Sequence, residues 1–143
     1  MRRKPLADGK VRPSKDGVAG KHLVRTIRTV QAAGKIPVII GPTPVAVFDV
    51  GACLRRETAG RLVMRPDKCT VDTRDVTTLA IERDLREVSA QTGAKLLLPS
   101  DLFCHRGSCA TRIEGKMIYR DRGHITPAAS RYFAAQSLQT AVY

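Results

Sequence analysis

The same order of features occurs twice in the sequence: an amphipathic helical pattern, a glycine, a short apolar run and a proline-containing loop. In the first copy, a helical pattern over residues 20–34 ends in a glycine, and the apolar run 36–40 follows. In the second copy, a helical pattern over residues 73–92 is followed by a glycine and the apolar run 94–98. Short, continuous apolar runs are typical of buried parallel strands. The sequence therefore predicts an α/β fold with two adjacent parallel strands and helices packed on their faces.

The remaining elements are shorter. Residues 45–72 show no sustained period and are interpreted as a long excursion without regular structure. Residues 112–119 predict a small hairpin that turns at Glu114 and Gly115. A last helix is expected after Thr126, which is suited to cap it. Two strands and a hairpin make a thin sheet, and strands this apolar normally have neighbours on both sides, so we expect an unpaired edge that can receive another strand.

The length of 143 residues and the 43% hydrophobic content fit one domain with a real core. Residues 1–19 are rich in glycine, proline and basic side chains and are interpreted as a basic flexible arm, with the domain proper over residues 20–143. No apolar run approaches the roughly 18 residues of a membrane span. No signal-peptide core follows the basic N-terminus. We therefore expect neither a transmembrane segment nor a signal peptide in the sequence.

The formal net charge of +12 favours polyanionic partners, which include nucleic acid, anionic lipid headgroups and acidic polysaccharide. Nucleic acid is the least favoured of these. The basic residues are not interleaved with aromatic side chains that could stack on bases, and no helix-turn-helix or zinc-finger spacing is present.

Four cysteines, Cys53, Cys69, Cys104 and Cys109, allow two disulfides in an oxidising compartment. Nearness in sequence favours Cys53 with Cys69 and Cys104 with Cys109, which is one of three possible pairings. Free buried thiols and a zinc site that includes His105 or His124 are the alternatives. The zinc interpretation suffers from poor spacing, because only one of the two cysteine pairs is close in sequence. No metal or other cofactor is expected.

The loop before the last predicted helix holds an acid and an imidazole three residues apart, Asp121 and His124. A carboxylate can orient an imidazole, and the imidazole can then accept a proton from a hydroxyl nucleophile. Taken alone, the spacing also fits a polar loop at a helix entry. Asp121 and His124 are nevertheless the candidate catalytic residues.

The order of motifs from residue 20 onward resembles the SGNH, or GDSL-like, domain found at the C-terminal end of bacterial membrane acyltransferases of acyltransferase family 3. The matching pieces are GKIPVIIGPTP (34–44), CLRR (53–56), Cys69, PSDLFC (99–104), Cys109, GKMIY (115–119) and the pair Asp121 and His124.

The resemblance implies a three-layer α/β/α fold with a parallel sheet, two structural disulfides and a catalytic pair of Asp121 and His124. It further implies esterase or O-acyl-transfer chemistry, such as O-acetylation, on acylated sugars or on polysaccharides of the bacterial envelope, including lipopolysaccharide. The location it implies is the periplasm or cell envelope, and the partner it implies is a membrane acyltransferase domain.

The sequence departs from the family pattern at the nucleophile. The family's serine lies in a Gly-Asp-Ser block on an N-terminal strand, and this sequence contains neither that block nor any asparagine to serve as an oxyanion donor. Ser14 is the only serine before the first predicted strand, and its neighbours are typical of a mobile turn. We therefore expect the C-terminal portion of an SGNH-like domain whose nucleophile strand is missing, and which is incomplete unless a partner chain or domain supplies it.

Two alternatives stay open at this point. The chain can be a basic module that binds nucleic acid or an acidic glycan without catalysis, in which case Asp121 and His124 only shape a loop. It can also be a remnant that folds poorly. The sequence alone does not decide whether the chain is an enzyme.

Overall fold

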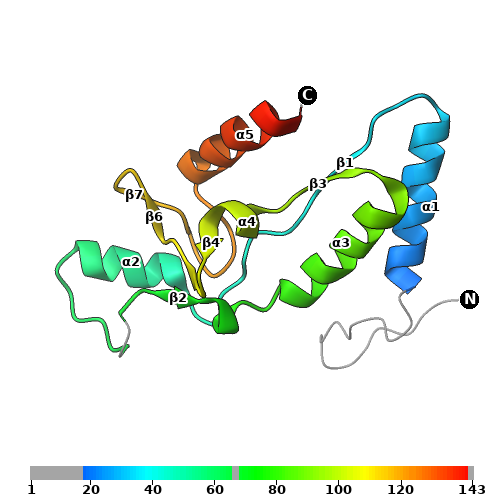
Figure 1. The fold of residues 1–143 in the computed structure, drawn as a ribbon. Coiled ribbons are helices and arrows are strands. Elements are labelled where there is room, and N and C mark those ends of the chain that lie inside the picture. Colours follow the sequence, from blue (N-terminus) through cyan, green and yellow to red (C-terminus); the bar gives the residue numbers. More distant parts are fainter. Residues whose placement is uncertain (1–17, 66–67, 142–143) are drawn as a thin grey trace, which may run out of the picture.

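A computed structural model describes residues 18–65 and 68–141, and it shows helices alternating with short strands (Figure 1). The predicted basic arm lies almost entirely outside the described residues, and Ser14 lies there too. None of the helices within these two ranges has the length and apolar character that crossing a membrane requires. The elements in chain order are α1 (Val18–Ala32), β1 (Val38–Ile40), α2 (Val50–Thr58), β2 (Val71–Asp72), the 3-10 turn η1 (Thr73–Asp75), α3 (Leu79–Thr92), β3 (Lys95–Leu97), α4 (Pro99–Phe103), β4 (Cys104–His105), β5 (Ser108–Cys109), β6 (Arg112–Ile113), β7 (Lys116–Met117) and α5 (Pro127–Ala141).

The two predicted strands pair in parallel, as the sequence indicates. In the β1–β3 pair, Ile39 lies opposite Leu96, and its neighbours follow the same register. The glycine before each strand lies in the left-handed region, with φ of 72° at Gly34 and 69° at Gly93. Glycine adopts this conformation without the steric penalty of a Cβ atom, which allows each helix to end abruptly. The α/β class predicted from the sequence is therefore confirmed.

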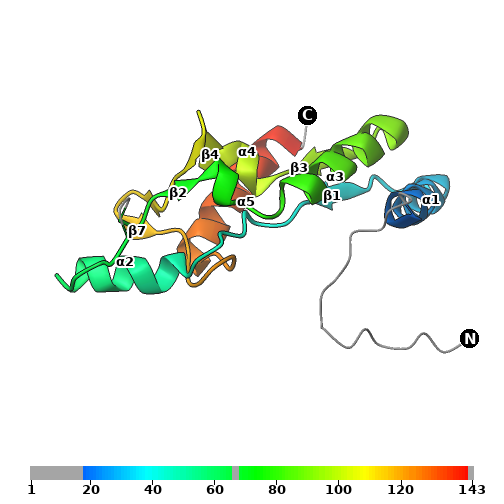
Figure 2. The ribbon, with the colours of Figure 1, turned by 90° about the horizontal axis from the view of Figure 1, so that it is seen from below.

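Helices α1 and α3 lie side by side next to the β1–β3 pair, and α2 lies at the other end of the molecule (Figures 1 and 2). The contact between α1 and α3 is a small hydrophobic cluster whose buried members are Ile27, Val88 and Ala94. Leu23 and Ile39 pack against it. This cluster joins one face of α1 to α3 and to the start of β3.

The strand β1 is more exposed than its apolar sequence predicts. Ile36 just before the strand is 91% exposed and Ile40 at its end is 65% exposed. Within the described ranges, β1 pairs with β3 alone. The expectation of a buried strand is therefore wrong for these residues, because no described element covers the outer side of β1.

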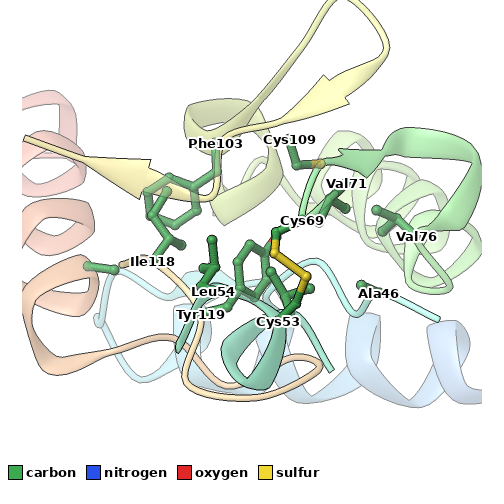
Figure 3. Packing of buried hydrophobic residues seen from close by; sticks show 12 residues of the cluster. Ala46, Cys53, Leu54, Cys69, Val71, Val76, Phe103, Cys109, Ile118 and Tyr119 are labelled. Atoms are coloured by element: carbon green, nitrogen blue, oxygen red, sulfur yellow. A yellow bond between two sulfur atoms is a disulfide. The ribbon is translucent and has the colours of Figure 1, made fainter. Parts of the chain in front are cut away.

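The larger hydrophobic cluster lies around α2 and the segment before α5. Figure 3 shows the Cys53–Cys69 disulfide beside Leu54 and Tyr119, with Phe103 and Ile118 beyond them on the same side. The remaining fully buried members of this cluster are Ala46, Val50, Val71, Val76, Cys109 and Ala129.

Two helices were not predicted from the sequence, and a third begins later than predicted. The excursion over residues 45–72 contains α2, whose first turn is capped by Asp49 through a 2.7 Å bond from the Ala52 N–H to Oδ1. The predicted helix over residues 73–92 begins only at Leu79, since the turn η1 and a short loop come first. The loop expected from Ser100 is the short helix α4, with Pro99 at a first-turn position that tolerates proline.

Small antiparallel sheets complete the structure. Strands β2, β5 and β4 form one sheet, and β6 and β7 form the predicted hairpin with left-handed Glu114 and Gly115 at its turn. The second disulfide joins Cys104 to Cys109 across the β4–β5 pair. Both disulfides have the pairing that nearness in sequence favours, and no cysteine among the described residues is free.

Candidate acid–base site

The loop that carries the candidate pair is closed by backbone hydrogen bonds at its base. Tyr119 and Ile125 form an isolated antiparallel bridge, and the Arg120 N–H donates to the His124 carbonyl at 2.8 Å. The loop then enters α5 through Thr126, whose hydroxyl oxygen accepts from the Ala129 N–H at 3.2 Å. The predicted cap at Thr126 is therefore confirmed, and the loop has a fixed start and a fixed end.

The carboxylate and the imidazole contact each other directly. Nδ1 of His124 lies 2.8 Å from Oδ2 of Asp121 and 3.0 Å from Oδ1. The side chain of His124 is 74% exposed, whereas that of Asp121 is 36% exposed. Among the described residues, none forms a hydrogen bond with Nε2 of His124. The Nε2 edge of the imidazole is therefore open to a reacting group.

Backbone donors hold Asp121 in its ionised form. The N–H groups of Gly123 and His124 donate to Oδ1 at 3.0 Å and 2.9 Å. The bond from Gly123 does most to hold the pKa of Asp121 well below its usual range, followed by the bond from the His124 N–H and by the imidazole. Partial burial opposes this effect. An ionised carboxylate against Nδ1 favours the tautomer that leaves Nε2 able to accept a proton.

The segment after β1 supports the loop from one side. The Ala46 N–H donates to the Arg122 carbonyl at 2.9 Å, and Nε of Arg122 donates back to the Ala46 carbonyl at 3.2 Å. The Thr43 hydroxyl donates to the Gly123 carbonyl. The Cα of Gly123 faces Val45, so closely that a Cβ atom there would lie 2.7 Å from its Cγ2. These contacts place the pair beside the carboxyl end of β1.

The first turns of α2 support the loop from the other side. The Gly51 N–H donates to the Asp121 carbonyl at 3.3 Å, and Nη1 of Arg55 donates to the Arg120 carbonyl at 2.9 Å. A Cβ atom on Gly51 would lie 2.0 Å from the Arg120 carbonyl oxygen. Gly51 was not singled out from the sequence, and Arg55 was included only as part of the CLRR motif, without a role. Local patterns do not show that helix and loop meet across about 70 positions of sequence.

The other residues singled out from the sequence make no hydrogen bond with the side chains of the pair in the described parts of the chain. Tyr119 at the base of the loop has no exposed surface, and burial raises its pKa to about 12. His105 is exposed and bonds through Nε2 to the Leu102 carbonyl at 3.1 Å. Because both cysteine pairs are disulfide-bonded, the zinc interpretation has no thiolate to use. No group of three metal-binding side chains occurs in the described parts of the chain.

Comparisons with known proteins extend these observations. The model of the family described as SGNH domain (fused to AT3 domains) matches residues 3–139, which includes most of the predicted arm. The structure is similar to that of a Salmonella ser. Paratyphi A lipopolysaccharide acetyltransferase periplasmic domain, with a TM-score of 0.68 and 15% sequence identity. The similarity covers 94% of this chain and 54% of that chain, so this chain spans about half of the solved domain. A search of curated proteins found no match.

Proposed function

Because the chain belongs to the SGNH domain family, we propose that Asp121 and His124 are the acid–base pair of a serine-dependent site for O-acyl transfer or ester hydrolysis. The observation that carries this proposal is the 2.8 Å contact between Asp121 and Nδ1 of His124, combined with an exposed Nε2 edge. The proposed substrate class is supported by the similarity of the fold to that of a lipopolysaccharide acetyltransferase domain. We therefore assign acylated sugars or polysaccharides of the bacterial envelope as substrates.

The chemistry uses the pair twice. A serine oxygen attacks the carbonyl carbon of the acyl donor while its proton passes to Nε2 of His124, and Asp121 stabilises the resulting imidazolium. The departing alcohol takes that proton, which leaves an acyl-serine ester. A sugar hydroxyl then attacks the ester, loses its proton to His124 and becomes acylated. Serine leaves with the returned proton; if water replaces the sugar, the reaction is hydrolysis.

The exposed edge of β1 supports delivery of the serine by a segment other than those described. Ile36 and Ile40 are strongly exposed beside a strand edge with no partner among the described strands. In a parallel sheet all carboxyl ends lie at one border. A strand that pairs in parallel with β1 would therefore end beside the loop of Thr43, which contacts the loop of the candidate pair.

The same comparisons support a partner and a compartment for this chain. The family description names AT3 domains as fusion partners, which supports a membrane acyltransferase domain as the source of acyl groups. The structurally similar domain is periplasmic, and two disulfides are compatible with an oxidising compartment. We assign the chain to the periplasmic side of the bacterial envelope.

The test compares the chain alone with a fusion that places a Gly-Asp-Ser strand before residue 18. With p-nitrophenyl acetate, the fusion is expected to release a burst of p-nitrophenol equivalent to the enzyme concentration. The chain alone is expected to release p-nitrophenol only at the background rate. His124→Ala in the fusion should abolish the burst. Asp121→Asn should slow it by about 1000-fold or more, as loss of the orienting carboxylate does in serine hydrolases.

His22→Ala is the matched control, because His22 is an exposed histidine on α1. This variant should keep the full burst. A burst that survives His124→Ala would refute the role of the pair. A burst of equal size from the chain alone would refute the claim that the nucleophile comes from elsewhere.

A further inference from the structure

An open hollow along α2 and the residues just after it is lined by three arginines and two alanines. Its volume is about 290 Å³, and its lining residues are Ala52, Arg55, Arg56, Ala59 and Arg61. All three arginines are exposed. Because three arginines line one hollow, a compact ligand bound in it can contact more than one guanidinium group.

The positive charge of this hollow is not neutralised by the described parts of the chain. Arg55, Arg56 and Arg61 form no salt bridge with any residue of the ranges 18–65 and 68–141. The one carboxylate within α2, that of Glu57, is 3.4 Å from Nη2 of Arg112 on β6 and is thereby engaged. The hollow therefore presents three guanidinium groups with unused donors.

Two of the guanidinium groups are already oriented by backbone carbonyls. Nε of Arg56 donates to the Leu62 carbonyl at 3.3 Å, and Nη1 of Arg55 donates to the Arg120 carbonyl at 2.9 Å. A guanidinium has five N–H donors in a planar fork, so one bond to a carbonyl fixes its direction and leaves others for a ligand. Such forks suit the paired oxygens of carboxylates and phosphates.

The hollow is also close to the point where α2 contacts the loop of the candidate pair. Gly51 contacts the loop of Asp121, and Ala52, the first residue of the hollow, follows it directly. Since a helix rises about 1.5 Å per residue, the residues from Ala52 to Ala59 span only about 10 Å. A polymer held in the hollow can therefore extend across the loop that carries the pair.

We propose that the arginine hollow on α2 is a binding subsite for an anionic group of the envelope glycan, a carboxylate or a phosphate, carried on a sugar near the one that is acylated. This inference rests on the proposed function for the identity of the polymer. Nucleic acid shares the phosphate chemistry, but none of the described residues that line the hollow is aromatic and able to stack on a base. The hollow therefore fits an anionic glycan better than a single-stranded nucleic acid.

Binding to the 143-residue chain tests the subsite without any need for catalysis. The probes are an oligogalacturonate for carboxylates, mannose 6-phosphate for phosphate, a neutral dextran oligosaccharide and a single-stranded DNA oligonucleotide, each titrated by calorimetry at low and at high salt. We expect both anionic sugars to bind with an affinity that falls steeply with salt, and dextran to show no binding. NMR spectra should place the largest shifts on α2.

The double variant Arg56→Gln/Arg61→Gln should weaken binding of oligogalacturonate at least 10-fold. The matched control is Arg25→Gln/Arg28→Gln, which removes the same charge from exposed positions of α1 and should change affinity less than 2-fold. Arg55 is left intact because it also supports the loop. His124→Ala should bind normally, so failure of the catalytic proposal leaves this readout unaffected.

Three results would overturn the subsite. Equal loss in both double variants would show that only the overall charge attracts the sugar. If neither anionic sugar binds, the proposal that the hollow holds an anionic group of a glycan is refuted. Binding of DNA that depends on Arg56 and Arg61, together with weak binding of the sugars, would reassign the hollow to nucleic acid.

Discussion

Replacement of Gly51 by alanine tests how tightly α2 is packed against the loop of the candidate pair. The new Cβ atom would lie 2.0 Å from the carbonyl oxygen of Arg120, 2.2 Å from its carbonyl carbon and 2.7 Å from the backbone nitrogen of Asp121. All three are backbone atoms, so no side chain can rotate away. Either the helix or the loop must move.

The expected magnitude is a balance of two effects. Overpacking of this kind lowers the free energy of unfolding by about 1–3 kcal/mol. The upper end of this range applies here because the new Cβ atom meets backbone atoms. Replacement of glycine by alanine inside a helix raises the free energy of unfolding by up to about 1 kcal/mol, because alanine has the higher helix propensity. The net loss is therefore about 2 kcal/mol, which corresponds to a fall in Tm of about 8 °C for a domain of this size.

Gly20→Ala is the matched control in α1. Its Cβ atom would meet only Cγ2 of Val88 at 3.7 Å, which is ordinary contact. This variant should keep its Tm or gain up to about 4 °C from helix propensity. Circular dichroism gives the two Tm values, and the amide signals of Gly123 and His124 should shift in Gly51→Ala alone. A Gly51→Ala protein as stable as the wild type, with unchanged loop signals, would refute the close contact.

Three further changes have defined outcomes. Replacing Cys53 and Cys69 by alanine removes a disulfide between residues 16 positions apart. The free energy of unfolding, measured in urea, should fall by about 3 kcal/mol. A loss below about 1 kcal/mol would contradict the structural role of this disulfide. The hydroxyl of Tyr119 is buried without a hydrogen-bond partner among the described residues, so Tyr119→Phe should leave stability unchanged or raise it by about 1 kcal/mol, and a clear loss in urea unfolding would reveal a partner. Because the pKa of Asp121 is lowered, its contribution to stability is complete above about pH 4 and is lost as the pH falls below that value. Asp121→Asn should therefore show a smaller fall in Tm between about pH 5 and about pH 2 than the wild type. Identical profiles of Tm against pH for the two proteins would count against the ionised carboxylate.

Local patterns predicted the elements that depend on neighbouring residues. The glycines before β1 and β3 end their helices in the left-handed conformation, and the turn at Glu114 and Gly115 forms the expected hairpin. The contact between Asp121 and His124 was also accessible, because three residues of a tight loop suffice to bring the side chains together. These features need no information about distant parts of the chain.

Features that depend on distant contacts were missed. The nine residues of α2 include the apolar Val50, Cys53 and Leu54 at helical spacing, but the segment is too short and too charged to show a sustained period. The role of Gly51 arises only when α2 meets a loop about 70 residues further along the chain. The exposure of Ile40 depends on which elements cover β1, and a strand's own sequence does not specify its neighbours.

The separation of the two hydrophobic clusters determines how the molecule opens. The cluster of Ile27, Val88 and Ala94 has few members and no cross-link, whereas the larger cluster contains the Cys53–Cys69 bridge. Regions with fewer buried apolar contacts unfold locally at lower free energy. Helix α1 can therefore separate from α3 in thermal fluctuations, while the loop around Asp121, which is hydrogen-bonded to α2, keeps its shape.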